Sequence, residues 1–228
     1  MSPNSSAPGS RWFTVPASVG AEPEWPAWAR YTRTPPPLYE VDSTDVVTAY
    51  TPQEQLLNTA VHEAGHAVLY LSAGHSVGSV ALEAPEDLSD LARAAVKYLP
   101  ATGPWLGFAL AYAAGERAED RWLRETGLWS MDRAWASECH AWGDRSQVAE
   151  VLQACHHREL TFHGHPGDWG DYAWITDRAD KALDQVWDQV LALGHHLAAH
   201  RFVTGEEAAR IAGIAPSPAN PTAALHTS

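Results

Sequence analysis

Apolar residues recur at helical spacing in the stretch that begins at Thr51. Thr51-Pro52-Gln53-Glu54 has the pattern of a capping box with proline at the first helical position, so a helix is predicted to start there. Gly74 is typical of the residue that follows the end of a helix. The apolar positions between these two signals are Leu56, Ala60, Ala64, Ala67, Val68 and Leu71. Their period predicts an amphipathic helix.

The rest of the chain is also predicted to be mostly helical. Further helices are expected over residues 86–99, 105–126, 144–158 and 177–200. A second capping box, Thr204-Gly205-Glu206-Glu207, opens a short final helix to Ala212. The best strand candidate lies in Val77–Glu83, and the glycines in residues 163–171 indicate a loop. The predicted fold class is mainly α, a helical domain with at most a small strand pair and an extended N-terminal arm.

Residues 1–50 differ from the rest in composition. Nine of the 16 prolines fall in residues 1–52. The aromatic residues of this stretch include Trp12, Trp25, Trp28, Tyr31 and Tyr39. Because each can bury a large apolar area, we expect residues 12–50 to lie against the body and partly cover the entrance to the site. The alternative is a tail that orders only in a crystal or on a partner. The predicted organisation is a partly disordered arm over 1–50, a body over 51–214 and a disordered tail over 215–228.

An H-E-x-x-H motif, His62-Glu63-Ala64-Gly65-His66, lies inside the first predicted helix. Residues four apart share one face of a helix, so both imidazoles can reach one metal ion. Neutral imidazole suits Zn²⁺, and Glu63 stands where it can take a proton from water on the metal and deliver it to a leaving amine. Gly65 costs roughly 1 kcal/mol relative to alanine inside a helix, so we expect a close approach there. The alternative is a pair of surface or core histidines.

Two histidines leave a catalytic zinc site one protein ligand short. Spacing does not choose among the remaining candidates, which are Asp144, Glu116, Glu119, Asp120, His140, His156, His157, His163 and His165. Asp144 has an alternative role as a helix N-cap, with Gln147 completing a capping box. Gly143 gives the backbone freedom to turn before it. Glu119 is either a carboxylate that orients a zinc-bound imidazole or a charge on a helix surface.

Four segments together resemble the peptidase domain of the FtsH-type AAA+ zinc metalloproteases. His62–Ala67 matches that family's zinc-helix motif, and Ala114–Asp120 is similar to its small-Gly-x-x-Ala-Glu-Glu segment. Gly143-Asp144, followed by a helix, resembles the segment of the third zinc ligand. Leu197–Glu207 is similar to the closing helix and its turn. The order and rough spacing agree from about Gln53 to Ile214.

The resemblance implies a zinc peptidase in which Glu63 is the catalytic residue. It implies that the Zn²⁺ ligands are His62, His66 and Asp144. Two departures stand out: Gly143 replaces the family's usual asparagine, and Val77–Pro104 lacks clear strand signals for the edge that pairs with substrate. The sequence has no G-x-x-x-x-G-K-[ST] loop, so we expect a stand-alone peptidase without the ATPase module.

The formal net charge of −13 and the two cysteines narrow the function classes. A strongly acidic chain argues against a general nucleic-acid binder and against docking on anionic lipid. Residues 105–115, the longest run near the middle without charge or proline, are too short to span a bilayer, and no secretory signal is visible. Cys139 and Cys155 do not make a disulfide framework. We therefore expect a cytoplasmic protein that binds neither nucleic acid nor membranes.

Three functions from different classes fit these features. The first is a zinc metallopeptidase that hydrolyses peptides or unfolded segments without ATP, alone, as a homo-oligomer or with a separate ATPase partner. The second is the same zinc fold recruited to tailor a small molecule or a modified peptide in a biosynthetic pathway. The third is a non-catalytic zinc-binding regulatory module. Glu63 counts against the third, because a purely structural zinc site does not need a carboxylate there.

Overall fold

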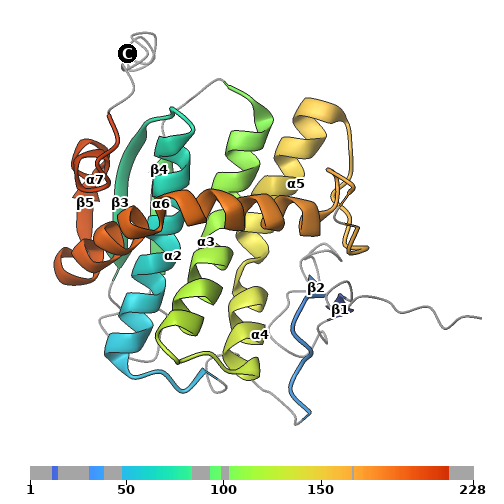
Figure 1. Ribbon diagram of the computed structural model, residues 1–228, viewed down its shortest axis with the longest axis horizontal. Coiled ribbons are helices and arrows are strands. Elements are labelled where there is room, and N and C mark those ends of the chain that lie inside the picture. Colours follow the sequence, from blue (N-terminus) through green and yellow to red (C-terminus); the bar gives the residue numbers. More distant parts are fainter. Residues whose placement is uncertain are drawn as a thin grey trace, which may run out of the picture.

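The computed structural model describes residues 12–14, 31–38, 48–83, 93–98, 103–165 and 167–215. These parts of the protein are mainly helical, with six helices, a three-stranded antiparallel sheet and a two-stranded ribbon near the N-terminus (Figure 1). The predicted mainly α fold class is confirmed.

The helix α2 lies in the middle of the fold, with α3 beside it and α6 across both (Figure 1). The three-stranded sheet lies on the side of α2 that faces away from α4 and α5. In chain order the elements are β1 Phe13–Thr14, β2 Tyr31–Thr32, α2 Pro52–Ser72, β3 Val77–Glu83, β4 Arg93–Tyr98, α3 Trp105–Glu125, α4 Met131–His140, α5 Trp142–His156, α6 Tyr172–His200, β5 Phe202–Thr204 and α7 Gly205–Ile211.

Both ends of α2 follow the signals in the sequence. The Thr51 hydroxyl accepts from the backbone N–H of Glu54 at 3.2 Å, and the Glu54 carboxylate accepts from the backbone N–H of Thr51 at 2.8 Å. This reciprocal capping box satisfies two backbone donors that the first turn leaves free. At the other end Gly74 has a φ of 82°, in the left-handed region that favours glycine. The predicted start and stop of the motif helix are confirmed.

The sheet corrects two predictions. β3 was predicted, but it pairs with both β4 and β5 in the order β4-β3-β5, so the sheet has three strands rather than a pair. The helix predicted over residues 86–99 is wrong for Arg93–Tyr98, which form β4; the other residues of that range lie outside the described parts. Alanine-rich composition favours a helix locally, but pairing with β3 overrides it. The alternating exposure of residues 95–98 has the period of a strand.

Several helix boundaries also differ from prediction. α5 begins at Trp142 rather than at residue 144, and α6 begins at Tyr172 rather than at residue 177. The earlier start of α6 follows from its N-cap, because the Asp171 carboxylate accepts from the Ala173 N–H at 2.9 Å. The sequence reasoning missed α4 altogether. Thr204 caps α7 as predicted, since its hydroxyl accepts from the Glu207 N–H at 3.2 Å.

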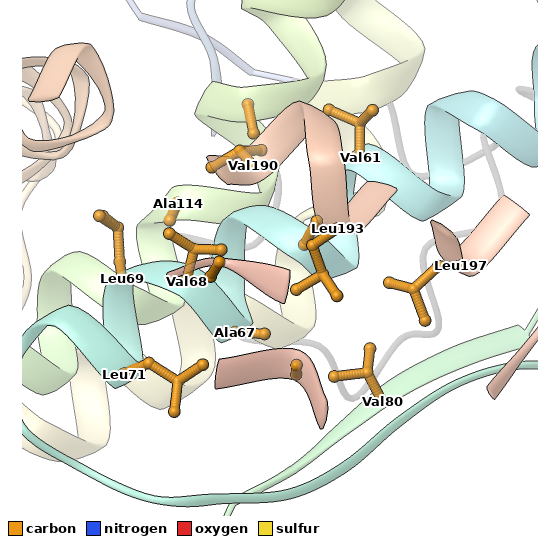
Figure 2. Close-up of a cluster of buried hydrophobic side chains, with 14 of the residues drawn as sticks. Val61, Ala67, Val68, Leu69, Leu71, Val80, Ala114, Val190, Leu193 and Leu197 are labelled. Atoms are coloured by element: carbon orange, nitrogen blue, oxygen red, sulfur yellow. The ribbon is translucent and has the colours of Figure 1, made fainter. Parts of the chain in front are cut away.

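The core gathers around α2 from three sides. Figure 2 shows α2 side chains facing side chains of α6 and β3, and all of those labelled are buried. The labelled residues are Val61, Ala67, Val68, Leu69, Leu71, Val80, Ala114, Val190, Leu193 and Leu197. Each fully buried valine or leucine among them stabilises the fold by about 1.5–3 kcal/mol. The helix that carries the H-E-x-x-H motif is therefore held rigidly by its surroundings.

α2 and α3 approach each other closely at Gly65. A Cβ at this position would lie 2.8 Å from the Ala114 carbonyl oxygen and 2.8 Å from the Ala118 Cβ. Both distances are below those of ordinary van der Waals contacts, so only glycine fits without a shift of one helix. The expected close approach at Gly65 is confirmed, and the neighbour is the backbone of α3.

The described parts of the arm contact the body. β1 pairs with β2, and the Trp12 and Tyr31 rings both pack on Phe162, each with centroids 5.0 Å apart. At the end of the arm, the Thr48 carbonyl accepts a hydrogen bond from the Arg133 side chain of α4 at 2.7 Å. Contact between arm and body is thus confirmed for these residues. Trp25, Trp28, Tyr39 and the predicted disorder of residues 1–10 and 216–228 lie outside the described residues, and coverage of the site entrance stays a prediction.

None of the described helices is both long enough and apolar enough to span a bilayer.

We expect Gly65→Ala to lower the free energy of unfolding by about 1–3 kcal/mol, because the added methyl overpacks the contact with α3. Gly143→Ala is the matched control. Gly143 also lies in a helix, and a Cβ at this position would meet nothing within 4 Å. The control should be unchanged or up to about 1 kcal/mol more stable. The measurement is chemical denaturation followed by circular dichroism in the presence of a chelator. Equal stability of Gly65→Ala and wild type would contradict the close contact.

Candidate metal centre

Three side chains that could ligate a metal converge between α2 and α5. The Nε2 atoms of His62 and His66 are 3.1 Å apart. The two oxygens of Asp144 lie 3.3 Å from His62 Nε2 and 3.3 Å from His66 Nε2. Among the described residues, this is the one group of three or more His, Cys, Asp or Glu side chains that could hold a metal ion. The structure therefore brings together the three ligands expected from the sequence.

The second nitrogen of each imidazole is held by an acceptor. His62 Nδ1 donates to Glu119 Oε2 at 3.2 Å, and His66 Nδ1 donates to the Ala111 carbonyl at 2.7 Å. The Asn58 amide donates to the other Glu119 oxygen at 2.5 Å and so fixes that carboxylate. Because a carboxylate and a carbonyl only accept, both Nδ1 atoms carry hydrogen, and the Nε2 lone pairs face the shared point. Glu119 is the orienting carboxylate rather than a surface charge.

The space between the ligating atoms of His62, His66 and Asp144 favours a positive charge. Burial lowers the pKa of His62, but hydrogen bonds to Asp144 and Glu119 outweigh burial, and the pKa lies well above its usual value. His66 shifts in the same direction, because attraction to Asp144 outweighs burial. Burial opposes ionisation of Asp144, yet the imidazoles hold its pKa well below the usual range. Either a proton or a metal cation can supply the charge that the cluster favours.

The spacing of the donor atoms fits a tetrahedral metal. Two ligand atoms at about 2.0–2.1 Å from a tetrahedral zinc lie about 3.3–3.4 Å from each other. The observed separations of 3.1 to 3.3 Å are close to that value without any movement of the backbone. Two imidazoles and a carboxylate are also a ligand set that leaves a fourth position for water or substrate. The residues present therefore fit the ion that the motif implies.

Gly115 on α3 makes room for the two imidazoles. A Cβ at this position would lie 2.3 Å from His66 Nε2 and 2.6 Å from His62 Nε2. No side chain can occupy that space while the two donors keep their positions. The glycine thus allows the α3 backbone to cover one side of the centre.

Asp144 projects from the first turn of α5 and does not cap the helix. α5 begins at Trp142 after Ala141, and no side chain accepts a hydrogen bond at its N-cap. The alternative interpretation of Asp144 and Gln147 as a capping box is therefore wrong. The backbone freedom expected of Gly143 is not used either, since this residue lies within the helix and its φ is not positive.

The other acidic candidates on α3 have different partners. Glu116 is buried in an ion pair with Arg145, at 2.9 Å from the guanidinium, and also accepts from the Tyr172 hydroxyl at 2.9 Å. Asp120 pairs with Arg117 at 3.2 Å and with Arg124 at 3.0 Å. Neither carboxylate belongs to the metal-ligating group.

The remaining histidine candidates do not join the group in the described structure. His156 packs against two tryptophan rings, while His163 and His165 lie near each other with centroids 6.1 Å apart. His140 lies in the last turn of α4 and His157 follows the end of α5. The described residues therefore offer no second cluster of three ligands.

Glu63 lies beside the centre with only 7% of its surface exposed. Burial raises the pKa of its carboxyl, and the nearby imidazoles partly offset that shift. Burial raises the phenol pKa of Tyr98, the last residue of β4, and the charges of Asp144 and Glu63 raise it further. Its ring packs on Tyr70, one turn beyond His66 on the same helix, at 4.5 Å. A buried carboxylate therefore lies directly beside His62 in the motif helix.

Sequence reasoning missed several residues that support the site. Asn58 precedes His62 by one helical turn, so helical periodicity could have placed it on the same face. The Ala111 carbonyl has no signal in the sequence because it is a backbone atom. Gly115 was noted only as part of a resemblance, and Arg145 was not singled out at all. Their roles depend on the crossing of α2, α3 and α5, which local sequence does not encode.

Comparison with known protein-family models finds no match for this chain, and a search of curated proteins finds none either. The resemblance to FtsH-type peptidases therefore rests on the motif residues and stays a hypothesis.

We expect substitutions around the centre to lower zinc affinity in a graded order. Glu119→Gln should lower it about 10- to 100-fold, because the amide orients the imidazole poorly. Asp144→Ala should lower it further, since it removes a donor atom itself. Asp188→Ala, an exposed carboxylate on α6, is the control and should bind like wild type. Competition with a chromogenic chelator measures the series, and full zinc retention by Asp144→Ala would exclude this residue as a ligand.

We expect Gly115→Ala to lose zinc binding while keeping its helix content, because the methyl displaces the two imidazole nitrogens. Gly143→Ala, adjacent to Asp144 but in open space, should bind zinc normally. Zinc content after dialysis and circular dichroism give the two readouts. Normal zinc content in Gly115→Ala would mean that the centre tolerates a shift of α3.

Proposed function

We propose that this chain is a zinc-dependent metallopeptidase that hydrolyses peptide bonds in peptides or unfolded segments. The observation that carries the proposal is the group of His62, His66 and Asp144 with a buried glutamate directly beside the first histidine. A non-catalytic metal site gains nothing from a carboxylate buried in that position, because burial of a charge costs free energy.

The three side chains would hold the Zn²⁺ through two imidazole nitrogens and one carboxylate oxygen. When bound, zinc supplies Lewis-acid chemistry, polarising a carbonyl group and acidifying water. One carboxylate among the ligands offsets part of the zinc charge, and the Nδ1 hydrogen bonds to Glu119 and Ala111 keep both imidazoles in the tautomer that can ligate.

Glu63 is suited to the proton transfers of amide hydrolysis. Its carboxylate can accept the proton of the attacking water and then give that proton to the nitrogen of the leaving amine. The position on α2 is fixed, because the helix is packed on α3, α6 and the sheet. A base on a rigid element keeps its distance to the reacting groups without further ordering.

A peptide substrate is supported by the sheet next to the site. Within the described residues β4 pairs with β3 alone, so no described strand pairs with its other edge. An extended peptide can add to such an edge as a further strand. Because β4 lies against α2, the helix that carries Glu63, a peptide paired with β4 would run close to the motif helix. This favours peptide cleavage over tailoring of a small molecule, which would not need a strand edge.

The substrate range follows from the parts of the chain. Without an ATP-driven unfoldase in this sequence, the peptidase would act on peptides, loops and disordered tails, or on chains delivered by a separate ATPase. The resemblance to FtsH-type peptidases is part of the proposal. It likewise assigns unfolding of the substrate to an ATPase and cleavage to the peptidase domain.

We expect Glu63→Gln to keep zinc and to lose about 10²- to 10⁴-fold in turnover, because an amide of nearly equal size cannot accept the proton. The assay is cleavage of a casein substrate and of a mixed peptide library, at zinc content matched to wild type. Glu159→Gln, an exposed glutamate, is the matched control and should be fully active.

Turnover of Glu63→Gln within about threefold of wild type would exclude the role of general base. A wild-type protein that binds zinc but cleaves no peptide would instead favour the tailoring or regulatory alternatives.

A further inference from the structure

We propose that the arm segment Tyr31–Thr34, called here the docking segment, is a working part of the metal centre. When it is docked on α4 and α5 it holds Asp144 in place, so docking and metal affinity are coupled. The inference rests on the proposed metal site but not on peptidase activity.

The first contact is between the docking segment and Glu138 on α4. Glu138 accepts from the Arg33 N–H, from the Thr34 N–H at 3.2 Å and from the Thr34 hydroxyl at 2.7 Å. Only 7% of the surface of Glu138 is exposed. Hydrogen bonds to a carboxylate are among the stronger ones, and three from two consecutive residues fix the segment in one register.

The second contact reaches the residue next to the third ligand. Arg145 follows Asp144 in α5 and is completely buried. Its guanidinium donates to the Tyr31 carbonyl of the docking segment and to Glu116 on α3, at 3.1 and 2.9 Å. The start of α5, and with it Asp144, is therefore tied to the arm on one side and to α3 on the other.

The third contact is aromatic and joins the same network. The Tyr31 ring stacks on Phe162, whose ring lies 5.5 Å from that of Tyr172. Tyr172 donates its hydroxyl to Glu116 at 2.9 Å. Since Glu116 directly follows Gly115, the network ends at the glycine that makes room for the two imidazoles.

The docking segment supplies the hydrogen-bond donors of a buried carboxylate. Of the two buried carboxylates in this region, Glu116 is paired with the Arg145 guanidinium, whereas Glu138 accepts its hydrogen bonds from the docking segment. Burial raises the pKa of Glu138, and repulsion from Glu116 adds to this, whereas Arg145 and the donors of Thr34 and Arg33 oppose it. Without the docking segment, Glu138 loses three donors and Arg145 loses an acceptor. Each unpaired buried group costs about 1–3 kcal/mol, so α4 and α5 would shift to reach water.

Such a shift moves Asp144 away from the imidazoles. Because coupling between two binding events is reciprocal, docking tightens metal binding and the metal tightens docking by the same factor. Two independent measurements on the full-length chain can therefore test one quantity.

The first experiment compares Glu138→Gln with Glu159→Gln, an exposed glutamate that loses the same charge. Zinc affinity is measured by chelator competition, and docking is measured by the rate of trypsin cleavage after Arg30 and Arg33. An amide at position 138 offers one acceptor oxygen in place of two. We expect cleavage to rise about tenfold and zinc affinity to fall at least about fivefold, the lower end of typical coupling. Glu159→Gln should match wild type in both.

The second experiment reads the coupling in reverse and separates it from general destabilisation. Zinc alone should slow cleavage after Arg30 and Arg33 in the wild-type protein, and it should not do so in Asp144→Ala. A role of the arm in overall stability only would not make cleavage depend on that one side chain.

Release of the docking segment with zinc affinity within about twofold of the control would overturn the proposal, since typical coupling is larger. Equal protection by zinc in wild type and Asp144→Ala would overturn it as well. If Glu138→Gln does not fold or does not release the segment, Tyr31→Ala, which removes the stack on Phe162, is judged by the same two outcomes. A protein that shows this coupling but cleaves no peptide would refute only the peptidase function.

Discussion

Two glycines set the distance between α2 and α3, and the candidate metal centre depends on that distance. Gly65 lets the Ala114 carbonyl and the Ala118 methyl of α3 approach the back of the motif, while Gly115 lets α3 pass close to the two imidazoles. At this separation the Ala111 carbonyl and the Glu119 carboxylate reach the Nδ1 atoms. A methyl group at Gly65 would collide with α3, and one at Gly115 would collide with the two imidazoles. The packing of the two helices and the orientation of the imidazoles therefore depend on each other.

The same constraint places charged groups inside the fold. α2 is surrounded by α3, α6 and the sheet, so its polar residues face a region of low polarity. The structure meets the cost of burial by pairing: Glu119 with His62 and Asn58, and Glu116 with Arg145 and Tyr172. Buried ion pairs contribute little net stability, yet breaking one is costly. Such pairs therefore restrict which arrangements of α3 and α5 are accessible, and this supports a preorganised ligand set.

Elements with strong local signals were predicted well. The capping box at Thr51 and the glycine at position 74 gave the limits of α2, because backbone caps act within one turn of the chain. The spacing of His62 and His66 placed both on one face for the same reason. β4 was predicted as a helix because residues 93–98 have no partner in their own neighbourhood of the sequence. Their partner β3 is supplied only by the fold.

The sequence by itself determined the motif helix, the two imidazoles that it aligns and the glutamate beside them, since all of these follow from a period of 3.6 residues. The choice of Asp144 over the other carboxylates was decided by the tertiary structure. α5 starts two residues earlier than its sequence suggests and turns Asp144 toward α2, while Arg145 binds Glu116 and the arm. Side chains far apart in the chain meet only where helices cross. Such crossings depend on packing across the whole core, whereas periodicity describes one element at a time.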